Sequence, residues 1–129
     1  MDKLELVIEM KVEVTQEDID DIMCIALEGG VNYWISQCRV VGEKLLGEYA
    51  SEQISRGGEL ELYDYEEDTW HLLTKNSFLE GLKKYLENPC CSDIAEVIDN
   101  KIRIDTSYAD AEVCDVIIQL AIFGEIVYG

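Results

Sequence analysis

The residues that most often carry enzyme chemistry are sparse in this sequence. His71 is its one histidine, so a metal site built on two histidines is excluded and a Ser-His-Asp triad would have to use His71. The motifs GxxxxGK, GxSxG, HExxH and GxGxxG are absent. His71 follows Trp70 in a predicted strand, where we expect it to face solvent or to pack on a ring. The sequence therefore predicts a protein that acts by binding and not by catalysis.

The five cysteines have no spacing that is typical of a metal site or of a disulfide framework. Their number is odd, no secretion signal is visible, and the adjacent Cys90 and Cys91 are not a CxxC pair. Cys24 and Cys114 fall on apolar faces of predicted helices, where a cysteine usually behaves as a small hydrophobic residue. No spacing of acidic residues resembles a calcium-binding loop. We expect no metal and no cofactor.

One acidic stretch is a candidate binding surface, because it holds six carboxylates in the ten residues from 59 to 68. On a strand, Glu59 and Glu61 point to one side, so neighbouring carboxylates lie about 6 to 7 Å apart, similar to the phosphate repeat of a nucleic-acid strand. Such a face could occupy a basic groove. The alternative is a solvated hairpin whose charges prevent edge-to-edge aggregation. The expected partner-binding residues are Glu59, Glu61, Asp64, Glu66, Glu67 and Asp68.

A second candidate site surrounds the two glycines at positions 29 and 30. A predicted helix ends there and is followed by Asn32, Tyr33 and Trp34, while Glu28 precedes the glycines. A carboxylate, an amide and two large rings next to flexible backbone could line a ligand pocket and stack on a planar group. The alternative is a helix end followed by aromatic side chains that pack in the core. The candidate pocket residues are Glu28, Asn32, Tyr33 and Trp34.

The net charge restricts the class of partner. The chain has 28 acidic and 10 basic residues in 129, for a formal charge of −18. Such a field repels nucleic acid and anionic membranes and accelerates association with a basic partner. No signal peptide and no apolar run of membrane-spanning length is visible, so a cytoplasmic protein is expected.

The elements that position these residues follow from hydrophobic periodicity. Apolar residues occupy every even position from Leu4 to Val14, which predicts a strand with one buried face. Thr15 opens a helix with a capping box, and we expect this helix to end at Gly29 and Gly30, with a glycine in the left-handed conformation.

Further along, we predict strands at 32–41 and 60–64, a hairpin partner at 69–73, and a loop with a short helix at 43–55. A helix capped by Thr74 or Asn76 precedes Pro89. We also predict a short helix at 93–98, a strand at 101–104, and a last helix that Ser107 caps and Gly124 ends. The fold class is α+β: one domain over residues 1–129, with a mainly antiparallel sheet of about four to five strands packed against about three to four helices.

Three segments resemble a known pattern. They are Ala26–Trp34 (ALEGGVNYW), Gly57–Asp64 (GGELELYD) and the tail, with ADA at 109–111 and IQLAIFG at 118–124. The pattern is similar to that of an uncharacterised family of small acidic proteins encoded by phages and prophages of Gram-positive bacteria. The resemblance spans most of the chain in order and implies no catalytic residue. It implies a phage context and the cytoplasm of a bacterial host cell, where small acidic phage proteins often block a host nuclease, polymerase or CRISPR effector.

The leading hypothesis is therefore a phage-encoded, anti-CRISPR-like inhibitor of a host defence factor. Its acidic surface would mimic nucleic acid and occupy the basic groove of a nucleic-acid-binding enzyme. A second hypothesis is a protein that sequesters a signalling nucleotide, which would need Arg39, Arg56 and Arg103 gathered near the pocket. A third is a structural or regulatory phage protein.

Overall fold

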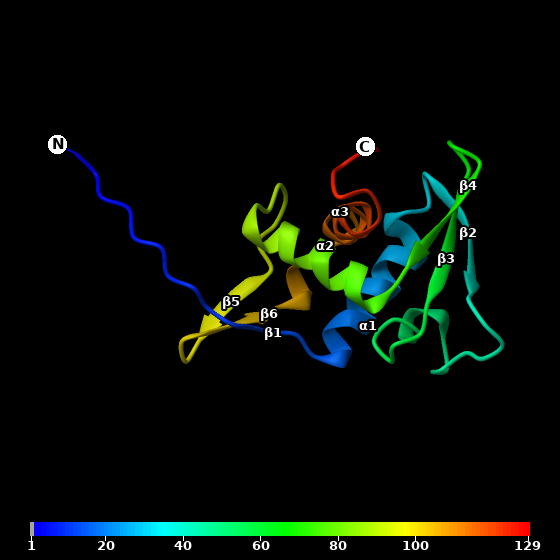
Figure 1. Ribbon diagram of the computed structural model, residues 1–129, viewed down its shortest axis with the longest axis horizontal. Helices are drawn as coiled ribbons and strands as arrows, with labels where there is room; N and C mark the ends of the chain where they lie inside the picture. The colour runs from blue at the N-terminus through cyan, green and yellow to red at the C-terminus, as the bar shows by residue number, and fades with distance from the viewer. Residues whose placement is uncertain (1) are drawn as a thin grey trace.

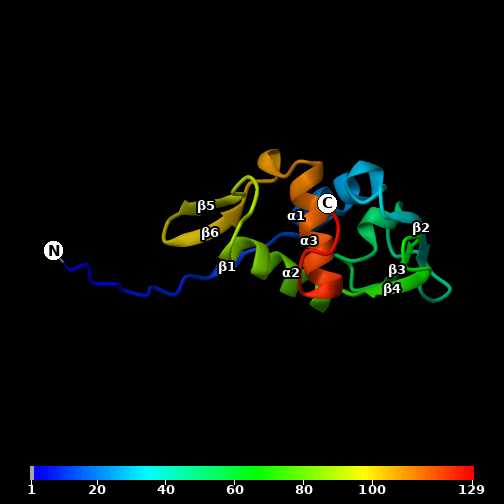
Figure 2. The same cartoon turned by 90° about the horizontal axis from the view of Figure 1, so that it is seen from above.

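The computed structural model describes residues 2–129 and places three α-helices between two small sheets (Figures 1 and 2). The helices are α1 (Gln16–Ile25), α2 (Lys75–Glu87) and α3 (Ala111–Phe123). All residues from Val113 to Gln119 are buried, so this part of α3 is covered on all its faces. The buried apolar side chains form one hydrophobic cluster. No helix of the described residues is both long and apolar enough to cross a membrane.

The first sheet has the order β2-β3-β4 and is antiparallel throughout. It contains β2 (Ile35–Val40), β3 (Leu60–Asp64) and β4 (Thr69–Leu73). The second has the order β1-β6-β5, in which β1 (Val12–Glu13) is parallel to β6 (Lys101–Ile104) and β5 (Ala95–Ile98) is antiparallel to it. The α+β class is thus confirmed, but the strands divide between two sheets and do not form one.

Most predicted elements of the middle of the chain are present. The strand expected at 32–41 is β2, the hairpin is β3–β4, and the short helix expected within 43–55 is the 3₁₀ turn η2 (Ala50–Glu52). Thr74 caps α2, and its hydroxyl accepts a hydrogen bond from the Ser77 amide at 3.1 Å. Gly124 ends α3 with φ of 75°, a left-handed conformation that glycine adopts without strain.

Two predictions in the C-terminal third are wrong. Residues 95–98 are the strand β5, not a helix, because they pair with β6 across a tight turn at Asp99 and Asn100, both of which have positive φ. The cap of α3 is Asp110 and not Ser107, since the Asp110 carboxylate accepts from the Val113 amide at 2.9 Å. Ser107 lies instead in a separate 3₁₀ turn, η3 (Thr106–Tyr108).

The strand predicted from Leu4 to Val14 is much shorter than its pattern suggests. Only Val12 and Glu13 pair, opposite Ile102 and Arg103 of β6. Further back along the chain, the parallel register runs off the start of β6 and into the turn before it, so no partner strand remains. Residues 2–11 therefore extend past the sheet as an exposed arm (Figure 1).

The glycines after α1 do not stop the helix in the way that the sequence suggests. The capping box of Thr15 is present, but the helix continues through the π-helical turn η1 (Ala26–Gly30), and neither glycine has positive φ. Gly30 is needed for space: a Cβ there would lie 2.7 Å from the carbonyl oxygen of Ala111 in the first turn of α3. The absence of a side chain at Gly30 allows η1 to pack closely on α3.

This contact gives a test with a matched control. We expect Gly30→Ala to lower the free energy of unfolding by about 1 to 3 kcal/mol, because the new methyl group meets backbone that cannot move independently. Gly29→Ala should be neutral or should stabilise by about 0.5 kcal/mol, since nothing lies within 4 Å of its Cβ position and alanine favours helix. Urea unfolding of both variants measures the two changes. Equal effects would contradict the packing role of Gly30.

Candidate functional site

In the acidic hairpin, residues 59–73, the side chains of β3 alternate between a buried and a more exposed face of the sheet. Leu60, Leu62 and Asp64 of β3 are completely buried, whereas Glu61 and Tyr63 lie on the opposite face. Period-two alternation therefore places the apolar residues of β3 toward the helices, as expected. Glu59 is partly exposed just before the strand, and Glu66, Glu67 and Asp68 are exposed in the turn that follows it.

Asp64 does not belong to the exposed acidic face. Its Oδ2 contacts His71 Nε2 at 3.0 Å and accepts from the Tyr128 hydroxyl at 2.8 Å. Its Oδ1 accepts from the backbone amides of Glu66 and Glu67 at 3.0 and 3.2 Å. Burial opposes the charge of Asp64, but these hydrogen bonds together outweigh burial and hold the pKa of the carboxyl below its usual value. Asp64 thus fixes the hairpin turn from inside and is unavailable to a partner.

The turn itself presents the remaining carboxylates to solvent. Asp68 has φ of 52°, a left-handed conformation that aspartate tolerates better than most residues. Its carboxylate accepts a hydrogen bond from the Tyr63 hydroxyl, and this bond, with burial adding to it, raises the pKa of Tyr63. Glu66 and Glu67 have no cation within ion-pair distance among the described residues.

The outer face of the β2-β3-β4 sheet combines aromatic, cationic and apolar side chains. The Arg39 guanidinium lies 3.8 Å from the ring centroid of Trp70, and its Nε is 3.2 Å from the Glu61 carboxylate. Tyr63 packs beside Trp70 with ring centroids 5.2 Å apart. Leu72, which pairs with Glu61 across the sheet, is 51% exposed. Trp, Tyr and Arg side chains are enriched at the centres of protein–protein interfaces.

The second candidate site does not form a pocket around its four residues. Trp34 is completely buried, and its indole N–H donates to Asp115 Oδ1 at 2.8 Å. It stacks on Tyr128 with ring centroids 5.0 Å apart. Glu28 and Asn32 are exposed. The interpretation of this segment as core-packing aromatics thus fits Trp34, and Tyr33 is the one member of the set that borders a sizeable groove.

That groove is unsuited to an anionic ligand. It has a volume of about 490 Å³, and its lining includes the carboxylates of Glu112 and Asp115 but no lysine or arginine. Cys91 also lines it, and burial, followed by hydrogen bonds with Cys90 and Glu112, raises the pKa of the Cys91 thiol to about 12. A thiol with such a pKa stays protonated at neutral pH and is a poor nucleophile.

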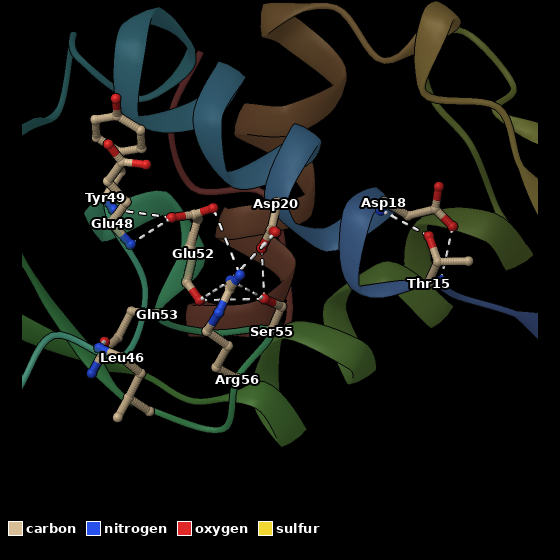
Figure 3. A network of polar contacts seen from close by, with 10 residues as sticks. All are labelled: Thr15, Asp18, Asp20, Leu46, Glu48, Tyr49, Glu52, Gln53, Ser55 and Arg56. Atoms are coloured by element: carbon tan, nitrogen blue, oxygen red, sulfur yellow. Dashed lines mark hydrogen bonds and ion pairs between the residues drawn. The ribbon is translucent and has the colours of Figure 1, made fainter.

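The three arginines that a nucleotide site would need are dispersed. Arg39 lies on β2, where it pairs with Glu61, and Arg103 lies on β6, 3.5 Å from Glu13. Arg56 lies 3.5 Å from Asp20 of α1 and 3.7 Å from Glu52 of η2, as Figure 3 shows. Each arginine is thus paired with acidic side chains in its own region, and this arrangement gives no support to nucleotide binding.

A buried polar network that the sequence did not predict joins the C-terminal residues to α3. Gln119 Oε1 accepts from the backbone amides of Val127 and Tyr128, both at 2.8 Å. Asp115, one turn earlier, accepts from the Tyr33 hydroxyl at 2.5 Å and from Gln119 Nε2 at 3.1 Å. The sequence contains one sign of this network: Asp115 and Gln119 are polar residues four positions apart in an otherwise apolar helical segment, so they lie on the same face of the helix and need buried partners.

His71 is connected to this network through Asp64, whose Oδ2 contacts both His71 and the Tyr128 hydroxyl. Its ring packs edge-on against Phe123 with centroids 4.9 Å apart, so it lies against a ring, which was one of the two expected placements. Potential ligand atoms of Asp64, Glu67 and His71 lie within 4.8 Å of one another. The Asp64 carboxylate already accepts four hydrogen bonds inside the protein, so this cluster is explained by the packing of the hairpin turn.

Comparison with protein-family models, with curated proteins and with solved structures found no match.

The role of Asp64 can be tested by stability against pH. We expect Asp64→Asn to lower the free energy of unfolding at neutral pH by about 2 to 3 kcal/mol, because an amide replaces a charged acceptor of four donors. The folded-state pKa of Asp64 is lowered, so its contribution is complete above the ordinary aspartate pKa and is lost as the pH falls through the folded value. The gap between wild type and variant should shrink in acid.

Asp68→Asn is the matched control, since the same change in the exposed part of the turn should alter stability by less than about 0.5 kcal/mol. Urea unfolding of the three proteins at neutral and acidic pH gives the comparison. A gap that stays constant down to strongly acidic pH would show that the Asp64 charge does not stabilise the fold.

Proposed function

We propose that this protein acts by binding a basic protein, through the outer face of the β2-β3-β4 sheet and the carboxylates around it. The observation that carries the proposal is the composition of this face. Arg39, Tyr63, Trp70 and Leu72 lie together on the face of the sheet opposite the buried Leu60 and Leu62. The helices lie to one side of this sheet (Figure 1). Such a group has the aromatic and arginine anchors of a protein-binding surface.

The charge of the molecule favours a cationic partner. In the described part of the chain, ion pairs to Lys or Arg involve four carboxylates, those of Glu13, Asp20, Glu52 and Glu61. The chain has 28 acidic residues, so most of its negative charge is not neutralised by a neighbouring cation. Part of this charge lies in the hairpin turn, on Glu66, Glu67 and Asp68. The turn is at one end of the anchor group, which comprises Arg39, Tyr63, Trp70 and Leu72. An unneutralised rim steers a basic partner and accelerates its association.

The class of partner follows from the same chemistry. Proteins that hold nucleic acid present extended basic grooves, and an acidic surface competes for such grooves. Together with the resemblance to small acidic phage proteins, this supports a phage counter-defence role, in which the protein blocks a nucleic-acid enzyme of the bacterial host in an anti-CRISPR-like manner. Compared with a purely acidic mimic, the surface proposed here adds an apolar and aromatic centre.

Reversal of the turn charges tests the proposal. In the triple variant Glu66→Lys, Glu67→Lys and Asp68→Lys, the dissociation constant for the basic partner should rise by about tenfold or more. The reason is that the charge that attracts the partner becomes repulsive. Glu80→Lys, Glu96→Lys and Glu125→Lys make the same change of charge at exposed positions away from the hairpin and should retain it. Tagged proteins immobilised at low and high salt, with captured host proteins identified by mass spectrometry, give the comparison.

A further variant separates the anchor group from the overall charge. Leu72→Glu makes the protein more acidic but places a charge at the centre of the proposed face, so we expect it to weaken capture. If capture depended on net charge alone, this variant would bind as well as the wild type or better. Equal capture of the same basic protein by the wild type and both triple variants would overturn the proposal.

A further inference from the structure

The N-terminal arm, defined as residues 2–11, leaves a strongly patterned segment exposed. Leu4, Leu6 and Ile8 are 97%, 84% and 73% exposed, although they continue the alternation to which Val12, paired with Ile102 of β6, and Val14, packed against the core, belong. An isolated chain gains nothing from apolar residues at every second position of an uncovered segment. The pattern therefore indicates a surface that another strand covers.

The inward side of the arm borders an apolar groove on α2. Ile8, Met10, Val12 and Val14 line one wall of this groove, and its volume is about 730 Å³. The other wall includes Leu79, Leu82 and Leu86 of α2 with Ile102 of β6. Glu9, Lys83 and Glu87 complete the lining. Ile8 and Met10 of the arm thus border the same largely apolar surface as Val12 of β1.

The outer edge of β1 has backbone hydrogen-bonding groups that face away from β6. The carbonyl oxygen of Lys11 accepts from the Ile102 amide at 3.0 Å, so the backbone groups of odd-numbered residues point toward β6. Those of the even-numbered residues Met10 and Val12 consequently point away from it, because strand backbone groups alternate in direction. In the order β1-β6-β5, no described strand lies on that side.

We propose that the occupant of this edge is the arm of a second copy of the protein, paired antiparallel about a two-fold axis at Ile8. In this register Leu6 lies opposite Met10 of the second copy and Leu4 lies opposite Val12. These even-numbered pairs use the unpaired backbone groups described above. The two sheets then join as one continuous six-stranded sheet, whose two central strands are the arm and β1 of each copy, and the interface is isologous.

The charges of the arm favour this register over its neighbours. With Ile8 on the axis, Lys3 faces Glu13 of the second copy and Glu5 faces Lys11, and each pair occurs twice by symmetry. With Val7 on the axis, Lys3 would face Lys11 and Glu5 would face Glu9, so like charges would oppose each other. With Leu6 on the axis, Lys3 faces Glu9, but Lys11 has no acidic partner. Opposite charges across a strand pair stabilise and like charges destabilise it.

The second copy also completes the groove. Side chains directly opposite in an antiparallel pair point to the same face, so Leu4 and Leu6 of the second copy extend the apolar wall formed by Met10 and Val12. This addition brings them toward the α2 side, where Leu79 and Leu86 are partly buried. The arm is therefore covered on its apolar face and solvated on its charged face, as alternation requires.

Sedimentation equilibrium of the full chain tests the pairing. The wild type should have twice the mass of one chain, and Ile8→Lys should be a folded monomer, since it brings two charges together on the axis at a position that is exposed in the single chain. Val7→Lys is the matched control: Val7 is 87% exposed, lies on the other face and faces Glu9 of the second copy, so it should remain a dimer. Circular dichroism checks that both variants are folded.

A charge exchange tests the register. Glu5→Lys alone and Lys11→Glu alone should each raise the dissociation constant of the dimer by about tenfold or more, because two attractive pairs become repulsive. The double variant restores opposite charges and should return the constant to near that of the wild type. A wild type that stays monomeric at all concentrations overturns the proposal, as does a dimer that Val7→Lys disrupts and Ile8→Lys does not.

Discussion

The structure depends on a helix that is buried on all sides and still carries polar side chains. Asp115 and Gln119 of α3 are buried, and an unsatisfied polar group in such a place would destabilise the fold. They are satisfied only because Tyr33 and Trp34 come from one direction and the backbone of Val127 and Tyr128 from another. This requirement brings together parts of the chain that are far apart in sequence.

The network continues from α3 to the proposed binding face. Tyr128 donates its hydroxyl to Asp64, and Asp64 in turn holds the amides of the hairpin turn. Burial, with the neighbouring Asp64 carboxylate, raises the pKa of Tyr128, so the phenol remains a donor through the physiological range. The position of the exposed carboxylates in the turn is thus set by the core, through one aspartate that is itself withdrawn from solvent.

Sequence periodicity predicted several elements whose partners are close in the chain. The β3–β4 hairpin, the capped helix α2 and the glycine that ends α3 follow from local patterns. Two of the failures involve distant contacts, whereas β5 was missed although its partner β6 is the next strand in the chain. The alternation from Leu4 to Val14 indicates a strand, but pairing depends on the length of β6, almost ninety residues later. Gly30 resembles a helix terminator until its contact with Ala111 is known.

In the acidic hairpin, too, local patterns were informative and distant contacts were not predicted. Alternation correctly separates Glu61 from Leu60 and Leu62, but it cannot distinguish a surface carboxylate from one that is satisfied internally. Asp64 occupies the same face as the leucines, and its donors come from His71, from the turn and from Tyr128. The sequence did not predict the anchor group on the outer face of the sheet. Arg39 and Trp70 lie on strands that are not adjacent in the chain, so no local pattern joins them.

The two tryptophans occupy contrasting environments, and this gives the protein a built-in optical readout. Trp34 is sealed in the core beside Tyr128 and Phe123, so its emission reports on the integrity of the fold. Trp70 lies under Arg39 on the outer face, where the indole is only partly shielded and any molecule that docks there changes its surroundings. Because the chain has no other tryptophan, single replacements would assign each spectral component to one ring. Folding and docking could then be followed separately in the same unlabelled sample.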